Sequence, residues 1–291
     1  MKHDSNPLKT HLLDLLHELH GQDVPLILGG GYGLYLKQLH LQDDGKTPTL
    51  IKGELWPVPR ATEDLDILLR TEIVVDAQRM RPIRAALDQL NYTAISGAEY
   101  MQFAKDLGGG QSVKIDFLTG PLGSLINDPR VKIDDRRVRP RPSVKLHAHR
   151  IDEAIGFQDN TSVIQIQGTR SSGDTYQAEI HVPSPLTLLL MKLHAFRDRF
   201  EDEKKDLARH HALDIYRIIA MMTEPEFTST QEQIAVDKEQ PVLTESSRIV
   251  SEFFSTPESM GCLRLRDHSL WNEQMALGEF LSALNDLFRP E

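Results

Sequence analysis

The stretch Arg60-Ala-Thr-Glu-Asp-Leu-Asp-Ile-Leu-Leu69 alternates polar and apolar residues as a half-buried strand does, and the other elements are interpreted around this strand. Side chains two residues apart on a strand share a face, so Asp64 and Asp66 lie together and Leu65 and Ile67 point away from them. Two neighbouring carboxylates repel each other unless a cation compensates them. A hard divalent ion with oxygen ligands, Mg²⁺ above all, suits this pair. A solvated acidic strand end is the alternative, and this stretch alone leaves both open.

A glycine-rich turn lies upstream, in Val24-Pro-Leu-Ile-Leu-Gly-Gly-Gly-Tyr-Gly33. Its apolar part, residues 24–28, predicts a core strand, and residues 31–39 follow with the spacing of a helix. A strand, a glycine turn and a helix N-terminus together leave backbone N–H groups where a phosphate could bind. Gly29 and Gly30 lack the side chains that would block such an approach.

A second alternating stretch, Ser112-Val-Lys-Ile-Asp-Phe-Leu118, lies downstream and places Lys114 and Asp116 on one face. Asp116 could therefore bring a third carboxylate to the same metal ion from a neighbouring strand. Residues 100–105 and 112–118 flank a run of glycines, which predicts a hairpin. A hairpin favours a mixed sheet over a fully parallel one.

Taken together, these stretches resemble the polymerase-β-like nucleotidyltransferase superfamily. Within it, the chain is most similar to the type IV toxin–antitoxin nucleotidyltransferases of the abortive-infection toxin family. The matching segments are Gly29-Gly30, Arg60-Ala-Thr62-Glu-Asp64-Leu-Asp66, Lys114-Ile-Asp-Phe117, Lys192-Leu-His-Ala-Phe-Arg-Asp-Arg199 and Lys205-Asp-Leu-Ala-Arg-His-His-Ala-Leu-Asp-Ile-Tyr216. The chain departs from the family in two places: a longer connection from Gln38 to Pro59, and Gly31-Tyr32-Gly33 in place of the usual turn.

The resemblance implies a metal-dependent nucleotidyltransferase that moves a nucleoside monophosphate from an NTP to a hydroxyl of RNA, such as a tRNA-like acceptor, or of protein. It also implies a growth-inhibiting toxin with a cognate antitoxin. In the family pattern, Asp64 and Asp66 bridge two ions, Mg²⁺ or Mn²⁺, and Asp116 holds the catalytic ion where the attacking hydroxyl loses its proton. Gly29 and Gly30 let the backbone approach the phosphates.

Three further residues receive roles from the resemblance. Lys192, on a mostly apolar helix, either snorkels at the helix edge or clamps the triphosphate, and its family position favours the clamp. Arg60 either binds a phosphate or balances Glu63. Asp206 is favoured as the distal acidic residue of the site, with Asp214 as its rival.

Asp206 and Asp214 are eight residues apart, which is two helical turns, so both could face the same groove. His210 and Asp214, at i and i+4, could also bind a metal ion. An exposed polar helix face is the favoured interpretation of that pair, because the sequence offers no further strong ligand.

Pro183-Ser-Pro185 marks a change of character, because strand patterns end there and helical spacing continues afterwards. We therefore predict an α/β (α+β) fold, with a mixed-sheet nucleotidyltransferase domain over residues 1–184 and a helical domain over residues 185–291. Ser184 can cap the first helix and Pro185 suits its first turn. Residues 41–48 and 119–160 are predicted to be loops or loop-rich.

The composition narrows the class of protein. No run approaches the roughly 18 apolar residues of a membrane span, so we expect no membrane partner. The single cysteine, Cys262, excludes an internal disulfide, fits a reducing cytoplasm and is best interpreted as an apolar filler. The formal net charge of −10 argues against binding duplex DNA with the whole surface.

Two questions about the substrate stay open in the sequence. The acidic charge favours a small cationic acceptor such as an aminoglycoside. The basic stretch Arg130–Lys145 instead favours a triphosphate or RNA, unless it is a solvated hairpin. A catalytically silent, nucleotide-binding relative is the third possibility, against which the presence of Asp64, Asp66 and Asp116 argues.

Overall fold

The computed structural model describes residues 7–60, 62–98 and 100–288. The chain forms two compact units, and each consists of two segments of sequence. Unit 1 comprises Met1–Gly33 and Ala61–Pro183, and unit 2 comprises Leu34–Arg60 and Ser184–Glu291. The change of character at Pro183 thus coincides with a boundary between units. Residues 34–60 differ from the sequence-based division, because they group with the helical unit.

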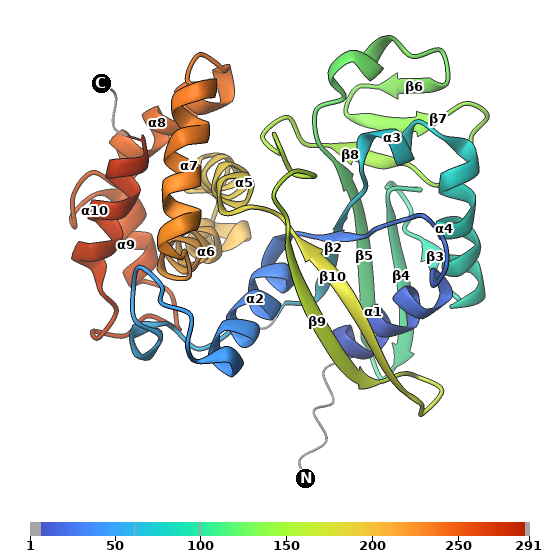
Figure 1. Cartoon of the computed structure of the whole chain (residues 1–291), viewed down its shortest axis with the longest axis horizontal. Helices are drawn as coiled ribbons and strands as arrows, with labels where there is room; N and C mark the ends of the chain where they lie inside the picture. Colours follow the sequence, from blue (N-terminus) through green and yellow to red (C-terminus); the bar gives the residue numbers. More distant parts are fainter. Residues whose placement is uncertain (1–6, 61, 99, 289–291) are drawn as a thin grey trace. The chain divides into compact units, whose positions relative to one another are not determined.

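A mixed sheet forms the core of unit 1, with ten strands in the described residues (Figure 1). The strands are β1 (Ile27–Leu28), β2 (Asp64–Leu68), β3 (Thr93–Ala94), β4 (Gln102–Gly108), β5 (Gln111–Thr119), β6 (Val131–Asp134), β7 (Arg137–Pro140), β8 (Ala148–Arg150), β9 (Ser162–Thr169) and β10 (Thr175–Val182). Their order is β6-β7-β8-β5-β2-β1-β10-β9, with β4 beside β5 and β3 beside β4. Because β2 is parallel to β5 and β4 antiparallel to it, the prediction of a mixed sheet is confirmed.

The two faces of this sheet differ in chemistry, as the alternation in the sequence predicts. On β2 and β5 the apolar side chains of Leu65, Ile67, Ile115 and Phe117 are buried. Helix α1 (Pro7–Glu18) packs near β2 and β5, and α4 (Ala77–Gln89) places Arg84 over the ring of Phe103, the β4 neighbour of Ile115. The apolar face is therefore covered by helices. The opposite face of β2 and β5 carries half-exposed charged residues.

Three stretches contain secondary structure that was not predicted for them. The region 119–160 contains β6, β7 and β8, together with a 3₁₀ turn at Gly123–Asn127. Val131 and Val138 are buried there, but the surrounding arginines and prolines hide the short alternation in the sequence. Helix α2 (Gly30–Asp44) runs through part of the predicted loop at 41–48, and the short helix α3 (Thr71–Val74) was not predicted.

Unit 2 is helical, as predicted for the C-terminal part of the chain (Figure 1). Its helices are α5 (Pro185–Arg197), α6 (Arg209–Ala220), α7 (Glu224–Asp237), α8 (Pro241–Phe253), α9 (Met260–Arg266) and α10 (Leu277–Phe288), with 3₁₀ turns at Gly53–Leu55 and Glu203–Ala208. The Ser184 hydroxyl accepts the Thr187 N–H at 3.3 Å, and Pro185 occupies the first turn of α5, which confirms the predicted cap. Cys262 is buried, and burial raises its pKa to about 11, in keeping with an apolar filler.

Residues 34–60 belong to unit 2 because their backbone and side chains bind to the end of α6. The Leu50 N–H donates to Met222 O at 2.8 Å, and the Tyr216 hydroxyl donates to Leu55 O at 3.2 Å. The Trp56 indole donates to Ile51 O at 2.8 Å, which folds the segment on itself. These bonds satisfy polar groups that would otherwise be buried without partners. No helix in the described residues combines the length and apolar character needed to span a bilayer.

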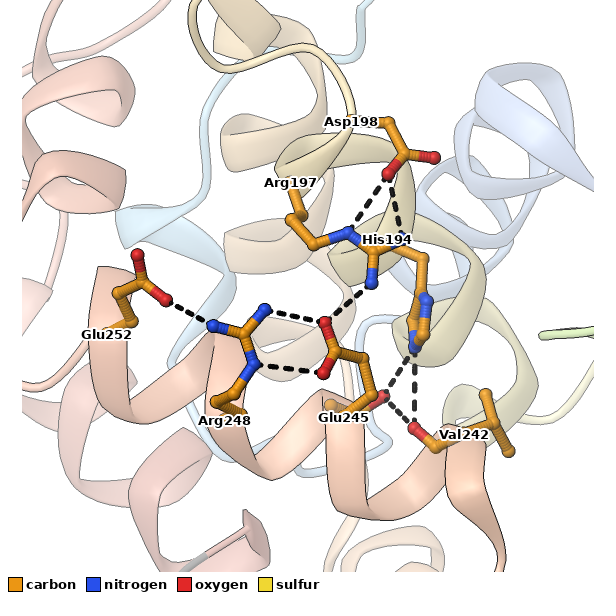
Figure 2. A network of polar contacts seen from close by, with 8 residues as sticks. His194, Arg197, Asp198, Val242, Glu245, Arg248 and Glu252 are labelled. Carbon is orange, nitrogen blue, oxygen red and sulfur yellow. Dashed lines mark hydrogen bonds and ion pairs between the residues drawn. The ribbon is translucent and has the colours of Figure 1, made fainter.

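A polar network joins α5 to α8 within unit 2 (Figure 2). Arg197 Nη1 donates to Glu245 at 2.6 Å, and Arg248 donates to the same carboxylate at 2.8 and 2.9 Å. His194 Nε2 lies 3.1 Å from the Ser246 hydroxyl and 3.3 Å from Val242 O. Glu245 is thus the centre of the network and joins the two helices through Arg197.

We expect Glu245→Gln to lower the free energy of unfolding of unit 2 at neutral pH by at most about 1 kcal/mol, because the carboxylate is partly solvated. Hydrogen bonds from Arg248 and Arg197 lower the Glu245 pKa to about 2, whereas the pKa of an unfolded glutamate is about 4.3. The stabilisation is therefore complete above the unfolded value and is lost as the pH falls toward 2. Urea denaturation of wild type and variant at pH 7, 5 and 3 measures this. A difference that stays constant down to pH 3 would contradict the assignment.

Candidate active site

Three carboxylates share the half-exposed face of β2 and β5. The parallel register pairs Asp64 with Lys114 and Asp66 with Asp116, and paired residues of adjacent strands point to the same side. We call Asp64, Asp66 and Asp116 the carboxylate face. The register thus places the three carboxylates on the same side of neighbouring strands, and their role as metal ligands stays a prediction.

Each member of the carboxylate face has a different neighbour. Lys114 Nζ lies 3.8 Å from Asp64 Oδ1, and Gln102 Nε2 donates to Asp116 Oδ2 at 2.9 Å. Burial raises the pKa of Asp116, the Gln102 hydrogen bond opposes that shift, and the charge of Asp64 adds to it. The surroundings of Asp116 therefore favour its protonated form more than water does.

Asp66 lies against the glycine turn. The Gly29 N–H donates to Asp66 O at 2.8 Å, which fixes the turn to β2. Gly30 has φ +60°, and a Cβ at this position would lie 1.7 Å from Asp66 Oδ2. Since α2 begins at Gly30, the Asp66 carboxylate also lies where the helix N-terminus favours negative charge. A glycine is thus required at position 30, and the role of Gly29 and Gly30 in holding a phosphate stays a prediction.

The oxygen atoms of the carboxylate face are suitable ligands for a divalent ion. All three ligands would be carboxylate oxygens, which Mg²⁺ and Mn²⁺ prefer. Asp64 Oδ1 is buried and accepts no hydrogen bond from the described residues. One oxygen that could bind a metal ion therefore has no hydrogen-bond partner among them. Within the same residues, no three His, Cys, Asp or Glu side chains lie close enough to hold a metal ion as they stand. Lys114 and Gln102 are instead the neighbours of two of these carboxylates.

We expect Gly30→Ala to destabilise unit 1 and to move Asp66. The positive φ alone costs an alanine roughly 1–2 kcal/mol, and the new methyl group would overlap the Asp66 carboxylate. Gly109→Ala is the matched control, because Gly109 has φ +62° and nothing within 4 Å of the added Cβ. Thermal unfolding of both variants measures the difference. Equal losses of stability would mean that the contact with Asp66 carries no weight.

Unit 2 holds a second charged group, which is buried around Asp214. Lys192 Nζ lies 2.7 Å from Asp214 Oδ2, Arg60 Nη2 lies 3.3 Å from the same oxygen, and Arg217 Nη1 lies 3.1 Å from Oδ1. Gln38 holds Arg217 in place, because its Oε1 accepts from Arg217 Nε at 3.0 Å. We call Arg60, Lys192, Asp214 and Arg217 the Asp214 cluster.

The Asp214 cluster carries more positive than negative charge. Although burial alone would raise the pKa of Asp214, the charges of Lys192, Arg60 and Arg217 hold it far below its ordinary value. Three cations surround a single carboxylate, and Arg217 Nη2 is buried with no hydrogen-bond partner in the described residues. Such a group has the charge to attract an anion.

The cluster changes the interpretation of two predicted residues. Lys192 does not snorkel at the helix edge, because it is buried and paired with Asp214. Arg60 pairs with Asp214 at 3.3 Å, an arrangement that the two alternatives weighed for it, a phosphate or Glu63, did not include. The phosphate role of either residue stays a prediction.

The structure separates Asp206 from Asp214. Asp206 lies in the 3₁₀ turn before α6 and has φ +57°, as do Leu207 and Ala208 at +50° and +59°. Helix α6 begins at Arg209, so the expectation that both aspartates face one groove at helical spacing is wrong. Asp206 pairs on the surface with Arg209 and His210, whereas Asp214 is fully buried with Lys192.

His210 takes part in a hydrogen-bonded chain of side chains. Its Nε2 lies 3.3 Å from Asp206 Oδ2, and its Nδ1 lies 2.8 Å from His268 Nε2. His268 Nδ1 accepts the Leu270 N–H at 3.0 Å. His210 is half-exposed, in line with the polar helix face that the sequence predicts, and its nearest partners are His268 and Asp206.

Sequence reasoning missed three polar residues that complete these sites. Arg217 follows Asp214 at i, i+3, a spacing that places two side chains together on a helix and could have revealed it. Gln102 is the β4 neighbour of Asp116, and the predicted hairpin gave no register to show this. Gln38 reaches Arg217 through a contact distant in sequence, for which the sequence carries no local signal.

Comparison with known proteins gives a family. The model of the nucleotidyl transferase AbiEii toxin family, from type IV toxin–antitoxin systems, matches residues 49–260. This range contains the carboxylate face, Lys192, Asp206 and Asp214, and it begins after the glycine turn. No curated protein matches the chain. Among solved structures, the chain is similar to an antigenic nucleotidyltransferase-like protein from Paracoccidioides brasiliensis. That match has 15% identity and a TM-score of 0.37, and it covers 83% of this chain and 92% of that one.

The family match spans most of the chain and rests on both units. The chain therefore belongs to the AbiEii nucleotidyl transferase toxin family of type IV toxin–antitoxin systems and is a nucleotidyltransferase.

Proposed function

We propose that the protein transfers a nucleoside monophosphate from an NTP to a hydroxyl group of RNA or protein, with Mg²⁺ or Mn²⁺ bound by Asp64, Asp66 and Asp116. The observation that carries this proposal is the placement of three carboxylates on one face of β2 and β5, with Gly30 against Asp66. A divalent ion would supply charge neutralisation of the triphosphate at this face.

The residues have distinct tasks in this reaction. The acceptor oxygen forms a bond to the α-phosphorus, the bond from that phosphorus to the bridging oxygen breaks, and pyrophosphate leaves. Asp116 accepts the proton of the acceptor hydroxyl, a task that suits a carboxylate whose pKa burial raises. Asp64 and Asp66 orient the nucleotide, and Gly29 and Gly30 leave room for its phosphates.

We also propose a role for the Asp214 cluster in nucleotide binding. Its excess positive charge suits the phosphates of an NTP, and Lys192 and Arg60 are its more accessible cations. In this proposal Asp214 replaces Asp206 as the distal acidic residue, because it sets the position of both cations. Asp206 instead pairs with His210 on the surface of unit 2.

The biological setting follows from the family. We propose a toxin of the cytoplasm, where NTPs are abundant, whose activity a cognate antitoxin opposes. A small cationic acceptor such as an aminoglycoside is the second candidate, which the net charge of −10 favours.

A labelling assay tests the proposal. The protein is incubated with each of the four α-³²P-labelled NTPs, Mg²⁺ or Mn²⁺, and one acceptor pool at a time: total RNA, protein extract or an aminoglycoside. We expect label in the RNA or protein pool, sensitive to nuclease or protease accordingly. Mg²⁺ with the correct NTP should also raise the melting temperature, because ligand at 100 times its Kd adds about 2.7 kcal/mol to the free energy of unfolding. No label and no shift with any NTP would refute the proposal.

A further inference from the structure

The basic stretch of the sequence forms a hairpin at one edge of the unit 1 sheet. Residues 130–145 contain seven Lys and Arg residues and two Asp residues, in a chain whose net charge is −10. Strands β6 and β7 pair Lys132 with Arg139 and Asp134 with Arg137. We call this pair of strands, with Arg136 at its turn and Arg141 after it, the basic hairpin.

The register of the strands puts the basic hairpin on the same sheet face as the carboxylates. Arg137 pairs with His149 on β8, and His149 pairs with Leu118 on β5. Leu118 alternates with Asp116 on β5, so their side chains share a face. Val138 and Ala148, at the intervening positions, are buried on the other face. The carboxylate face thus continues across β8 to Arg137 and Arg139.

Further contacts tie the segment before β8 to the segment before β4. Gln102 donates to Asp116, and two residues earlier Tyr100 O accepts the His147 N–H at 2.6 Å. The rings of Tyr100 and His147 pack edge to face, 5.2 Å apart. Burial first, and then the charges of Arg139 and Arg137, lower the pKa of His147 to about 4. The arginines therefore act on a residue that is linked through Tyr100 and Gln102 to Asp116.

Several cations of the hairpin are not neutralised by neighbours. Asp134 compensates Lys132 and Arg139, at 3.2 and 3.4 Å. Arg136, Arg137 and Arg141 make no side-chain hydrogen bond or ion pair with the described residues. Adjacent strands are about 4.8 Å apart, so β7 lies about 10 Å from β5 across the sheet. A polyanion bound at the hairpin would extend naturally toward the carboxylates.

We propose that the basic hairpin binds the phosphodiester backbone of a single-stranded nucleic-acid acceptor and leads its terminal hydroxyl to Asp116. The identity of the reaction rests on the proposed function, but the binding surface is an independent claim. Arginine donates in a planar fork that matches phosphate oxygens, and such contacts are independent of sequence. The acidic remainder of the chain would keep nucleic acid from binding elsewhere.

Fluorescence anisotropy with labelled 12-nucleotide RNA and DNA tests the surface. The variant Arg137→Gln/Arg141→Gln removes two hairpin cations. Arg79→Gln/Arg81→Gln is the matched control, because it makes the same change of charge on α4, which packs on the opposite face of the sheet. We expect the hairpin variant to bind about tenfold more weakly at low salt. Its plot of log K against log salt should flatten by about 1.4, since each single-strand phosphate contact contributes about 0.7. The control should match wild type.

The outcomes separate the surface from the reaction. Wild-type protein that binds neither oligonucleotide, or a hairpin variant that binds like its control, overturns the surface, whether or not NTP label is transferred. A variant that loses affinity for free NTP with Mg²⁺ instead of for oligonucleotide would make the hairpin a triphosphate site and would also overturn the proposal. Oligonucleotide binding that depends on the hairpin, in a protein that transfers no label, would uphold the surface and refute the reaction. Equal losses with RNA and DNA would show that the backbone is read without the 2′-hydroxyl.

Discussion

Asp64→Ala should abolish nucleotidyl transfer and leave unit 1 folded. If Asp64 binds the metal ion as proposed, its removal takes away charge stabilisation worth several kcal/mol in the transition state, so the rate should fall by about a thousandfold or more. The Asp64 side chain is 44% exposed and its Lys114 neighbour is 3.8 Å away, so little folding energy depends on this residue. Loss of one like charge from the carboxylate face should hold or raise the melting temperature. The labelling assay and a thermal melt measure the two effects.

Asp88→Ala is the matched control for this variant. Asp88 is also about half exposed in unit 1 and also pairs with a cation, Arg84, but it lies on α4. The change in residue type and in charge is the same, and transfer should be unaffected. A near-normal rate for Asp64→Ala would make the acidic strand structural and would leave the resemblance without its catalytic centre.

Asp214→Asn should lower the free energy of unfolding of unit 2 far more than Glu245→Gln or Asp206→Asn does. The change keeps the shape of the side chain and removes the charge that Lys192, Arg60 and Arg217 surround. Because Arg217 is almost completely buried, its charge cannot turn to solvent, and breaking a buried pair of this kind costs about 3–5 kcal/mol. Both tryptophans of the chain, Trp56 and Trp271, lie in unit 2. Their fluorescence during urea denaturation therefore reports on this unit.

Asp206→Asn provides the comparison within the same unit, because Asp206 pairs on the surface with Arg209 and His210. Its cost should stay below about 1 kcal/mol. Lys192→Met should recover part of the loss when added to Asp214→Asn, and the double-mutant cycle gives their coupling. Similar losses for Asp214→Asn and Asp206→Asn would show that the buried carboxylate is not the centre of the cluster.

The carboxylate face was predictable because its information is local. Alternation along β2 and β5 assigns Asp64, Asp66 and Asp116 to one face of each strand before any pairing is known. A different local signal gave the glycine turn, since a short apolar run followed by glycines has few other solutions. What alternation cannot supply is the order of strands. The common face of Asp116 and the basic hairpin depends on β8, a strand of only three residues.

The Asp214 cluster was only half predictable. Helical spacing after Pro185 correctly predicted α5 and placed Lys192 on it. The prediction that Asp206 and Asp214 lie on one continuous helix was wrong, because α6 begins only at Arg209. The failure has a specific cause: Asp206, Leu207 and Ala208 adopt left-handed backbone angles without a glycine, and such angles are fixed by tertiary contacts and not by local preference. Arg60 and Gln38 reach the cluster from a segment that the sequence gave no reason to separate from the first domain.

That segment has a consequence for how the protein is made. On the ribosome, Leu34–Arg60 emerges early, while α6, to which it bonds through Leu50 and Tyr216, follows only after all of β2 to β10. Contacts between segments so far apart in the sequence form late and make folding slow. Until they form, the apolar surfaces of both segments stay exposed and can aggregate. A fragment that ends at Pro183 would carry Leu34–Arg60 without its partners, and a fragment that begins at Ser184 would lack Arg60 and Gln38 around Asp214 and Arg217. The chain up to Pro183 thus contains all of unit 1, whereas unit 2 is completed by residues that are translated long before its helices.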